Sequence, residues 1–435
     1  MGSYIPSTYE ERLAMLKEMG LSSEEDLFAA LPESIRIKGL DLPEGLSEVE
    51  VGRRIKAMAE KNKVFKTIFR GTGAYNHYIP TIVKTVTSKE EFLTAYTPYQ
   101  AEISQGVLQS IFEYQTQICE LTGMDVSNAS VYDGAVAAAE AVFMCQERKR
   151  KGVVVAGTVN PQVLKVIETY CESRDVEVTL VEAEDYAVNP EKLAAALKDD
   201  TAAVYIESPN YYGVLEDMEA LIEKAHGIGA KVIMGVNPIS LGLLKTPGEF
   251  GADIAVGEGQ PLGLSIAFGG PYLGFMACKQ EMMRKLPGRI VGETEDHDGR
   301  RAFVLTLQAR EQHIRREKAS SNICSNEALC AMTASVYMAA MGPQGLKEVA
   351  MASASNAHYL AEKLGELGLK VKSDKPFFHE FLTDLPIDGK KLEDHLASKG
   401  MLSGLPLEGG MLWCCTELTG REEIDELIEA IKEVL

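Results

Sequence analysis

The sequence predicts an α/β protein built on a large, mainly parallel β-sheet and followed by a smaller α+β domain. Short apolar runs rich in valine and isoleucine recur between residues 152 and 256 of the 435-residue chain. Strands that are apolar throughout are typical of sheets buried on both faces. A segment with the apolar spacing of a helix separates most of these runs. This alternation indicates a parallel sheet that is covered by helices on both sides.

Residues 1–99 are predicted to form an N-terminal helical segment that ends in a loop. A Ser or Thr cap followed by early acidic residues begins two of the expected helices, at 8–16 and 22–28. A third, amphipathic helix is expected at 47–61. Residues 71–80 then break the helical pattern as a polar and aromatic loop.

Residues 100–325 are expected to form the large α/β domain. The predicted helices cover 107–121, 135–148, a stretch ending at Tyr170, 190–197 and 217–226. The predicted strands cover 152–156, 176–181, 202–206, 231–236 and 252–256. This order of elements is the one that a parallel sheet with crossover helices requires.

Residues 326–435 are expected to form a connecting helix and a small α+β domain. The long apolar helix that follows Ser321 is predicted to end at Gly342-Pro343. A helix at 348–364, a strand at 369–371 and a final helix at 421–434 follow, with further elements at 377–382, 390–399 and 411–415. The complete layout resembles the fold-type I enzymes that use pyridoxal phosphate (PLP), the aspartate aminotransferase-like fold.

The composition excludes several classes of partner. The chain carries 44 Lys and Arg against 64 Asp and Glu, a formal charge of −20, which disfavours nucleic-acid and membrane-surface partners. No apolar run approaches ~18 residues and no secretory leader is visible, so a cytoplasmic location is expected. The eight cysteines form no CxxC pair and the seven histidines show no metal-ligand spacing, which predicts reduced thiols and no metal site.

A PLP site in this fold needs a lysine amine, a carboxylate beside the pyridinium nitrogen and a helix N-terminus for the phosphate. Asn237, at the end of strand 231–236, carries no charge, and residues 252–263, which include Gln260 and Pro261, contain no lysine. The phosphate-loop candidate places Asp133 where the anion would lie, and the sequence offers no reason for it. On these residues alone, an α/β domain that never bound PLP remains an open alternative.

Long motifs carry a more specific resemblance. They are FRGTGAY at 69–75, AYTPYQAEISQG at 95–106 with EYQT at 113–116, NASVYDG at 128–134, and RREKASSNICSN at 315–326. These motifs closely resemble the P-protein of the glycine cleavage system, glycine dehydrogenase (decarboxylating). The similarity runs from Tyr4 to the C-terminus. The chain length and the missing lysine make it look like subunit 1, the α chain of the two-chain form.

The resemblance implies an α2β2 assembly in which the β subunit carries PLP on a lysine. Glycine would be decarboxylated there, and its aminomethyl group would pass to the lipoyl arm of the H-protein. The present chain would lack the Schiff-base lysine, would contain no catalytic residue of its own, and would contribute structure and side chains in trans to the site of the β subunit.

The resemblance also suggests which side chains reach that site. Tyr96 and Tyr99 are expected to approach the cofactor or substrate, with support from Gln100 and Ser104. Simpler explanations of these motifs are also open. Residues 96–100 could form a loop that only packs at an interface. His77 could be an incidental surface histidine, and residues 320–322 could only cap a helix. The remaining candidates are Tyr75, His77, Ser320, Ser321 and Asn322.

Two other functions stay open. One is a self-sufficient fold-type I PLP enzyme, such as an aminotransferase or lyase, and the other is a non-catalytic assembly protein on a retired PLP fold. Formation of a PLP–lysine adduct by the isolated chain would distinguish the first of these from the subunit hypothesis.

Overall fold

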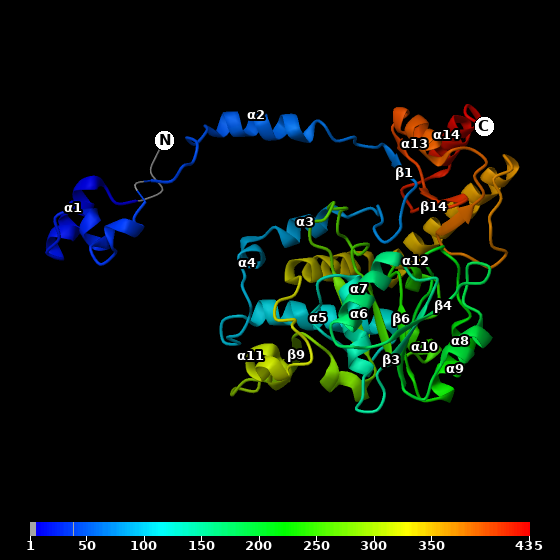
Figure 1. Cartoon of the computed structure of the whole chain (residues 1–435), viewed down its shortest axis with the longest axis horizontal. Coiled ribbons are helices and arrows are strands. Elements are labelled where there is room, and N and C mark those ends of the chain that lie inside the picture. Colours follow the sequence, from blue (N-terminus) through cyan, green and yellow to red (C-terminus); the bar gives the residue numbers. More distant parts are fainter. Residues whose placement is uncertain (1–5, 38) are drawn as a thin grey trace. The chain divides into compact units, whose positions relative to one another are not determined.

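The computed structural model describes residues 6–37 and 39–435, which divide into two units between Lys63 and Val64. The first unit contains helices α1 (Tyr9–Glu18) and α2 (Glu48–Ala59) and the 3₁₀ turns Glu24–Phe28 and Glu33–Ile35 (Figure 1). Thr8 and Ser47 begin the two α-helices as capping boxes, as the sequence predicts. The prediction of an α-helix at 22–28 is wrong. The capping box at Ser23 is followed by a five-residue 3₁₀ turn instead.

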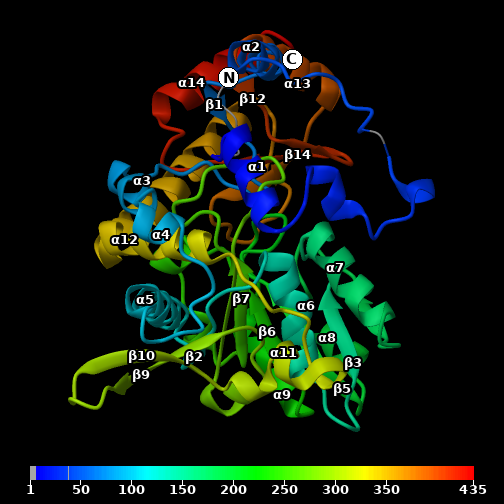
Figure 2. The same cartoon turned by 90° about the vertical axis from the view of Figure 1, so that its left-hand side faces the viewer.

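The second unit is organised around a seven-stranded sheet with strand order β2-β8-β7-β6-β5-β3-β4 (Figures 1 and 2). The five strands β7, β6, β5, β3 and β4 are parallel, and β8 runs antiparallel to both β7 and β2. The parallel core is therefore confirmed. The strands are β2 (Val126–Ser127), β3 (Gly152–Ala156), β4 (Val178–Val181), β5 (Thr201–Glu207), β6 (Lys231–Gly235), β7 (Ile254–Glu258) and β8 (Gly274–Cys278).

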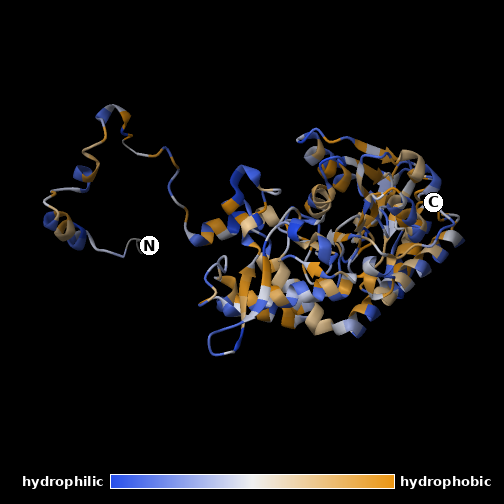
Figure 3. Ribbon diagram, turned by 90° about the horizontal axis from the view of Figure 1, so that it is seen from below, coloured by the Kyte–Doolittle hydropathy of each residue, from blue (hydrophilic) through white to orange (hydrophobic). Residues whose placement is uncertain are grey.

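Helices pack against this sheet and complete the hydrophobic core. Helix α6 contacts β5, β6, β7 and β8, and its alanines, such as Ala137 and Ala141, are fully buried. Small side chains let a helix lie close to a sheet. In Figure 3 hydrophobic (orange) and hydrophilic (blue) residues alternate along the helical ribbons, as expected for helices with one apolar face. The helices of this part are α5 (Gln105–Thr122), α6 (Gly134–Cys145), α7 (Pro161–Glu172), α8 (Pro190–Ala196), α9 (Met218–Gly227) and α10 (Pro247–Phe250).

A separate antiparallel hairpin, β9 (Ile290–Glu295) and β10 (Arg301–Thr306), was not predicted (Figure 2). It packs on α5 through Phe303 and Leu305, which are buried beside Leu108. The short helices α3 (Thr81–Thr87), α4 (Glu90–Leu93) and α11 (Gln312–Arg315) complete this part of the chain.

The long helix α12 (Ala328–Glu366) is interrupted at Gly342, where φ is 63° and ψ is 177°, and Pro343 follows. The predicted break at Gly342-Pro343 is therefore confirmed. The expected start directly after Ser321 is wrong, because Ile323 is buried and the Asn326 side chain donates to Ala129 and Ser130. These contacts hold the segment before Ala328 away from a helical path.

The C-terminal part is a small α+β structure. Its three-stranded antiparallel sheet has the order β11-β14-β13, and β1 pairs in parallel with β12. Trp413 is fully buried and donates from Nε1 to the Thr383 hydroxyl at 3.0 Å. The predicted strand at 369–371 is reduced to a single bridge between Val371 and Thr383. The elements are β1 (Thr67–Ile68), β11 (Glu380–Thr383), α13 (Gly389–Ser398), β12 (Met401–Leu402), β13 (Leu405–Leu407), β14 (Gly410–Cys414) and α14 (Arg421–Lys432).

No helix within residues 6–37 and 39–435 is long and apolar enough to cross a membrane. All eight cysteines are unpaired thiols, six of them buried.

Candidate functional site

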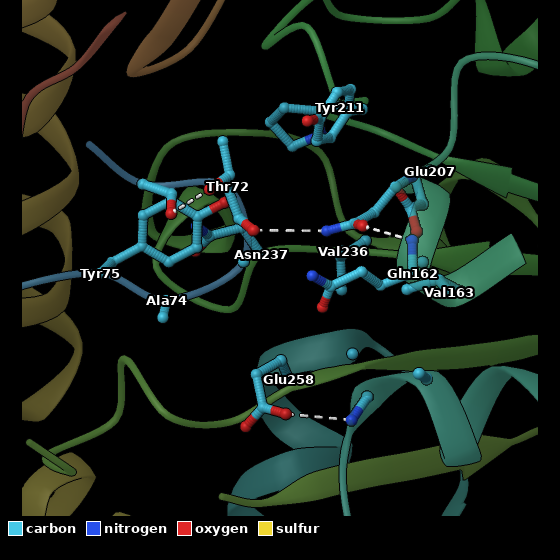
Figure 4. A pocket seen from close by; sticks show the side chains of 18 of the residues that line it. Thr72, Ala74, Tyr75, Gln162, Val163, Glu207, Tyr211, Val236, Asn237 and Glu258 are labelled. Atoms are coloured by element: carbon cyan, nitrogen blue, oxygen red, sulfur yellow. Dashed lines mark hydrogen bonds between the residues drawn. The ribbon is translucent and has the colours of Figure 1, made fainter. Parts of the chain in front are cut away.

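A cavity of about 540 Å³ lies at the carboxyl ends of the parallel strands (Figure 4). Its walls come from the residues at and after the ends of β5, β6 and β7, from the N-terminus of α6 and from the start of α7. Loop 71–75 and two residues of the C-terminal part, His379 and Glu380, complete the lining. Ligands of open α/β sheets bind at this end of the strands, so the cavity is the candidate site.

Glu207, the last residue of β5, is the first of three glutamates that line the cavity together with Asp133. It accepts hydrogen bonds from the backbone N–H of Asn160, at 2.8 Å, and from the Tyr205 hydroxyl, at 2.9 Å. Burial raises the pKa of Glu207 to about 7, against the opposing effect of these two hydrogen bonds. Gly235 of β6 makes room for this arrangement, since a Cβ there would lie 2.5 Å from the Tyr205 oxygen.

Glu258, at the end of β7, is the second carboxylate and lies on a different wall from Glu207 (Figure 4). It accepts from three backbone N–H groups, those of Gly134 at 3.0 Å and of Gln260 and Leu273 at 2.9 Å each. Burial raises its pKa to about 7, and the nearby Asp133 adds to the effect.

Glu380, at the start of β11, is the third carboxylate and is only 5% exposed. The backbone N–H of Thr72 and the Tyr75 hydroxyl donate to it, at 2.7 and 2.8 Å. Burial raises its pKa to about 7, and the charge of Glu207 contributes. A Cβ at Gly71 would lie 2.5 Å from Glu380 Oε1, so the loop backbone passes directly over the carboxylate.

No cationic side chain balances these groups within the described lining of the cavity. The described residues that line the cavity include neither lysine nor arginine. The one lining histidine, His379, is 2% exposed, and burial lowers its pKa to about 3, with a further contribution from His77. His379 is therefore neutral at physiological pH, and the cavity is acidic.

The N-terminus of α6, the phosphate-loop candidate, is already occupied by carboxylates of the chain itself. Asp133 is the N-cap of this helix, and its Oδ1 accepts from the Val136 N–H at 2.8 Å. The neighbouring Gly134 N–H donates to Glu258. This capping bond is the structural reason for the aspartate that the sequence left unexplained.

The turn after β7 holds Gln260, whose amide is fully hydrogen-bonded and 1% exposed. Its Oε1 accepts from the Tyr75 N–H at 2.8 Å, and its Nε2 donates to the carbonyls of Tyr75 and Leu264. Asn237 lies at the end of β6, where the sequence places it. Its Oδ1 accepts from the Ile239 N–H, and its Nδ2 lies 3.3 Å from His379 Nε2.

The expected site residues fall into three groups, and only the first reaches the cavity. Tyr75 lines it, and His77 lies beside it, 6% exposed and 2.6 Å from a carboxylate oxygen of Glu417. The His77 and His379 rings are stacked with centroids 6.4 Å apart. Both predicted residues are thus held by internal partners.

The second group lies in the loop before α5 and is absent from the cavity lining. Tyr96 is 89% exposed and Gln100 is also exposed. The Tyr99 hydroxyl accepts from Arg289, at 3.3 Å. Ser104 is the N-cap of α5, but its side chain makes no capping hydrogen bond.

The third group, Ser320 to Asn322, lies beside α7 and α6. The Ser320 carbonyl accepts from Arg174, and Ser321 accepts from the Ile323 N–H at 3.1 Å. The alternative that these residues cap the long helix is wrong, since α12 begins at Ala328 with Glu327 as its N-cap.

Sequence reasoning missed the three carboxylates that dominate the cavity. Glu207 and Glu258 each end an apolar run, at the position where parallel strands present side chains to a ligand. Their position at the end of a predicted strand could therefore have identified them as candidate site residues. Glu380 gave no such signal, because it enters the cavity from the C-terminal part only when the chain is folded.

The chain has the fold of the fold-type I PLP enzymes. Lactobacillus brevis glutamate decarboxylase superimposes with a TM-score of 0.67, covering 94% of this chain and 96% of that one, at 14% identity. Thermus thermophilus aspartate aminotransferase gives a TM-score of 0.59, covering 85% and 100%, at 15% identity. At such identities the likeness concerns the fold alone.

Closer similarities give the family. The sequence profile of the glycine cleavage system P-protein matches residues 2–431. Relatives named "Probable glycine dehydrogenase (decarboxylating) subunit 1" are 47% identical in Desulfitobacterium hafniense, covering 99% of this chain and 100% of the relative, and 48% identical in Moorella thermoacetica, covering 100% of both. A crystal structure of glycine decarboxylase (P-protein) in inhibitor-bound form has a TM-score of 0.94 at 45% identity, covering 100% of both chains. The chain belongs to the glycine cleavage system P-protein family and resembles its subunit 1 along its whole length.

Proposed function

We propose that this chain is the non-catalytic α subunit of glycine decarboxylase. Together with a PLP-carrying β subunit it would decarboxylate glycine and transfer the aminomethyl group to the lipoyl arm of the H-protein, within an α2β2 assembly. The observation that carries the proposal is the acidic lining of the cavity, with three glutamates and no lysine or arginine among its described residues.

These lining residues do not fit PLP. A Schiff base needs an amine, and the turn after β7 offers the amide of Gln260 instead. A bound phosphate needs free donors at a helix N-terminus or a cation. At α6 the N–H groups of Gly134 and Val136 already donate to Glu258 and Asp133, and those carboxylates would repel the phosphate. This misfit supports the proposal that a partner subunit carries the cofactor and that the chemistry takes place there.

The contribution in trans is proposed to come from the loop before α5. Tyr96 is exposed enough to enter a partner's site, and the contact with Arg289 orients Tyr99. Gln100 and Ser104 flank these two tyrosines. Tyr75 and His77 would act by bracing the loop, and Ser320, Ser321 and Asn322 would lie at a second contact. A cytoplasmic location and domain boundaries after residues 99 and 325 remain predictions.

A cofactor-binding experiment tests the first part of the proposal. The purified chain is mixed with PLP and treated with borohydride, and peptides are searched for a modified lysine. We expect no visible absorption of a lysine adduct and no stoichiometric modification. A single modified lysine at full occupancy would overturn the proposal and support a self-sufficient PLP enzyme.

A reconstitution experiment tests the contribution in trans. Tyr96→Phe and Tyr99→Phe remove one hydroxyl each, and we expect glycine–bicarbonate exchange by the complex to fall about tenfold or more. Tyr9→Phe, at an exposed tyrosine on α1, is the matched control. Unchanged exchange and unchanged subunit affinity in both variants would favour a purely structural assembly protein.

A further inference from the structure

We propose that the cavity at the carboxyl ends of β5, β6 and β7 binds a small organic cation that carries ammonium groups. The inference concerns this chain's own cavity and holds whether or not a partner subunit carries the cofactor. It assigns a ligand class to a site that the proposed function leaves without one.

The negative charge of the lining side chains favours a positively charged ligand. Glu207, Glu258 and Glu380 all line the cavity, and its described lining contains no lysine or arginine. A ligand with a carboxylate or phosphate would be repelled by these groups, whereas an ammonium group would be attracted. Ammonium groups carry only donors, and ionised carboxylates only acceptors, so the two are complementary.

The carboxylates also retain unused acceptor capacity. An ionised carboxylate offers about four acceptor positions. Glu207 and Glu380 each receive only two donors, a backbone N–H and a tyrosine hydroxyl. Acceptor positions that stay without a donor in a buried wall cost free energy, so this wall favours a ligand that donates hydrogen bonds.

The spacing of the carboxylates favours an extended organic cation over a metal ion. Over the described part of the chain, one group of three acidic or histidine side chains has its donor atoms within 4.8 Å of one another, and it consists of the exposed Asp296, His297 and Asp298. The three cavity glutamates form no such group. Separated charges in a cavity of about 540 Å³ suit a ligand with spaced ammonium groups, such as a diamine.

The glycines around the carboxylates show that their positions are built into the fold. A Cβ at Gly235 would lie 2.9 Å from Glu207 Cγ, and a Cβ at Gly71 would lie 2.5 Å from Glu380 Oε1. Tyr211 and Tyr272 also line the cavity and offer aromatic surface for the methylene chain of an amine.

Calorimetric titration of the isolated chain with putrescine, near 150 mM salt and at about pH 8, above the pKa of about 7 of the three glutamates, tests the proposal. We expect saturable binding of one putrescine per chain, weaker binding of butylamine, and none of 1-butanol or inorganic phosphate. Because the chain has a formal charge of −20, non-specific attraction would instead give weak binding at many sites. The absence of one-site binding would overturn the proposal.

Substitution of the lining glutamates tests whether the ligand binds in the cavity. Glu207→Gln and Glu380→Gln keep the side-chain shape and remove one charge each, and we expect each to weaken putrescine binding about tenfold or more. Glu172→Gln, at an exposed residue at the end of α7, is the control and should bind as the wild type does. Equal affinity in all three variants would refute the assignment, and if Glu380→Gln fails to fold, Glu207→Gln decides alone. A PLP–lysine adduct would overturn the proposed function without bearing on this result.

Discussion

Replacing Glu380 with glutamine removes a buried negative charge from the wall of the cavity. In the folded chain burial raises the pKa of this carboxyl from 4.5 to about 7, and Glu207 contributes. A carboxyl with a raised pKa stabilises the fold only while it is protonated. Its contribution is therefore complete below the unfolded value of 4.5 and is lost as the pH rises through 7. Glutamine stays neutral throughout this range.

The size of the effect follows from the two pKa values. Each pKa unit between the folded and unfolded states corresponds to about 1.4 kcal/mol, so ionising Glu380 in place costs about 3 kcal/mol. Most of this cost develops between about pH 5 and pH 8, where we expect Glu380→Gln to gain about 2 to 3 kcal/mol relative to wild type. The amide also loses the acceptor for the Tyr75 hydroxyl, which costs about 1 kcal/mol at every pH.

Urea unfolding followed by tryptophan fluorescence measures this difference. Trp413 is the only tryptophan of the chain and lies in β14, the strand that pairs with the strand of Glu380. The free energies of unfolding of wild type, Glu380→Gln and the exposed control Glu172→Gln are compared at several pH values. A difference between Glu380→Gln and wild type that is constant with pH, or that moves against the variant as the pH rises, would refute the reasoning.

Substitutions at three further positions test other contacts of the site. Gly235→Ala adds a Cβ 2.5 Å from the Tyr205 hydroxyl and should lower the free energy of unfolding by about 1–3 kcal/mol, so an unchanged urea midpoint would contradict the close approach. Asp133→Ala should cost about 1 kcal/mol and Asp133→Asn much less, whereas equal losses would argue against capping. Glu417→Gln replaces the carboxylate that is hydrogen-bonded to the buried His77 and should cost about 1–3 kcal/mol near pH 7. Burial acts to raise the pKa of Glu417 but His77 holds it below its ordinary value, so this cost should shrink as the pH falls, and a cost that grows towards about pH 4 would count against this contact.

The elements that the sequence predicted correctly have strong local causes. The strands β3, β5, β6 and β7 are apolar runs whose burial needs no knowledge of their neighbours. The capping boxes at Thr8 and Ser47 and the break at Gly342 are likewise set by a few adjacent residues. Strand β8 and the hairpin β9–β10 were missed because their pairing partners, not their own patterns, define them.

The candidate site was predictable only in part. Asn237, Gln260 and the loop at Asp133 were located correctly, because the order of strands and helices places them at one edge of the sheet. The capping role of Asp133 was not predicted, because it depends on the exact residue at which α6 begins. Glu380 is separated from Glu207 by more than half of the large domain and the whole of α12, and only folding brings the two charges to one cavity.

The segment from β1 to His77 has a mechanical consequence for the second unit. It is bonded to the C-terminal part through the pairing of β1 with β12, through Thr72 and Glu380, and through His77 and Glu417. The same segment is bonded to the large sheet domain through Tyr75 and Gln260. A hinge rotation between the two parts would have to break several buried hydrogen bonds at once. The segment therefore resists rotation of the C-terminal part against the large sheet domain.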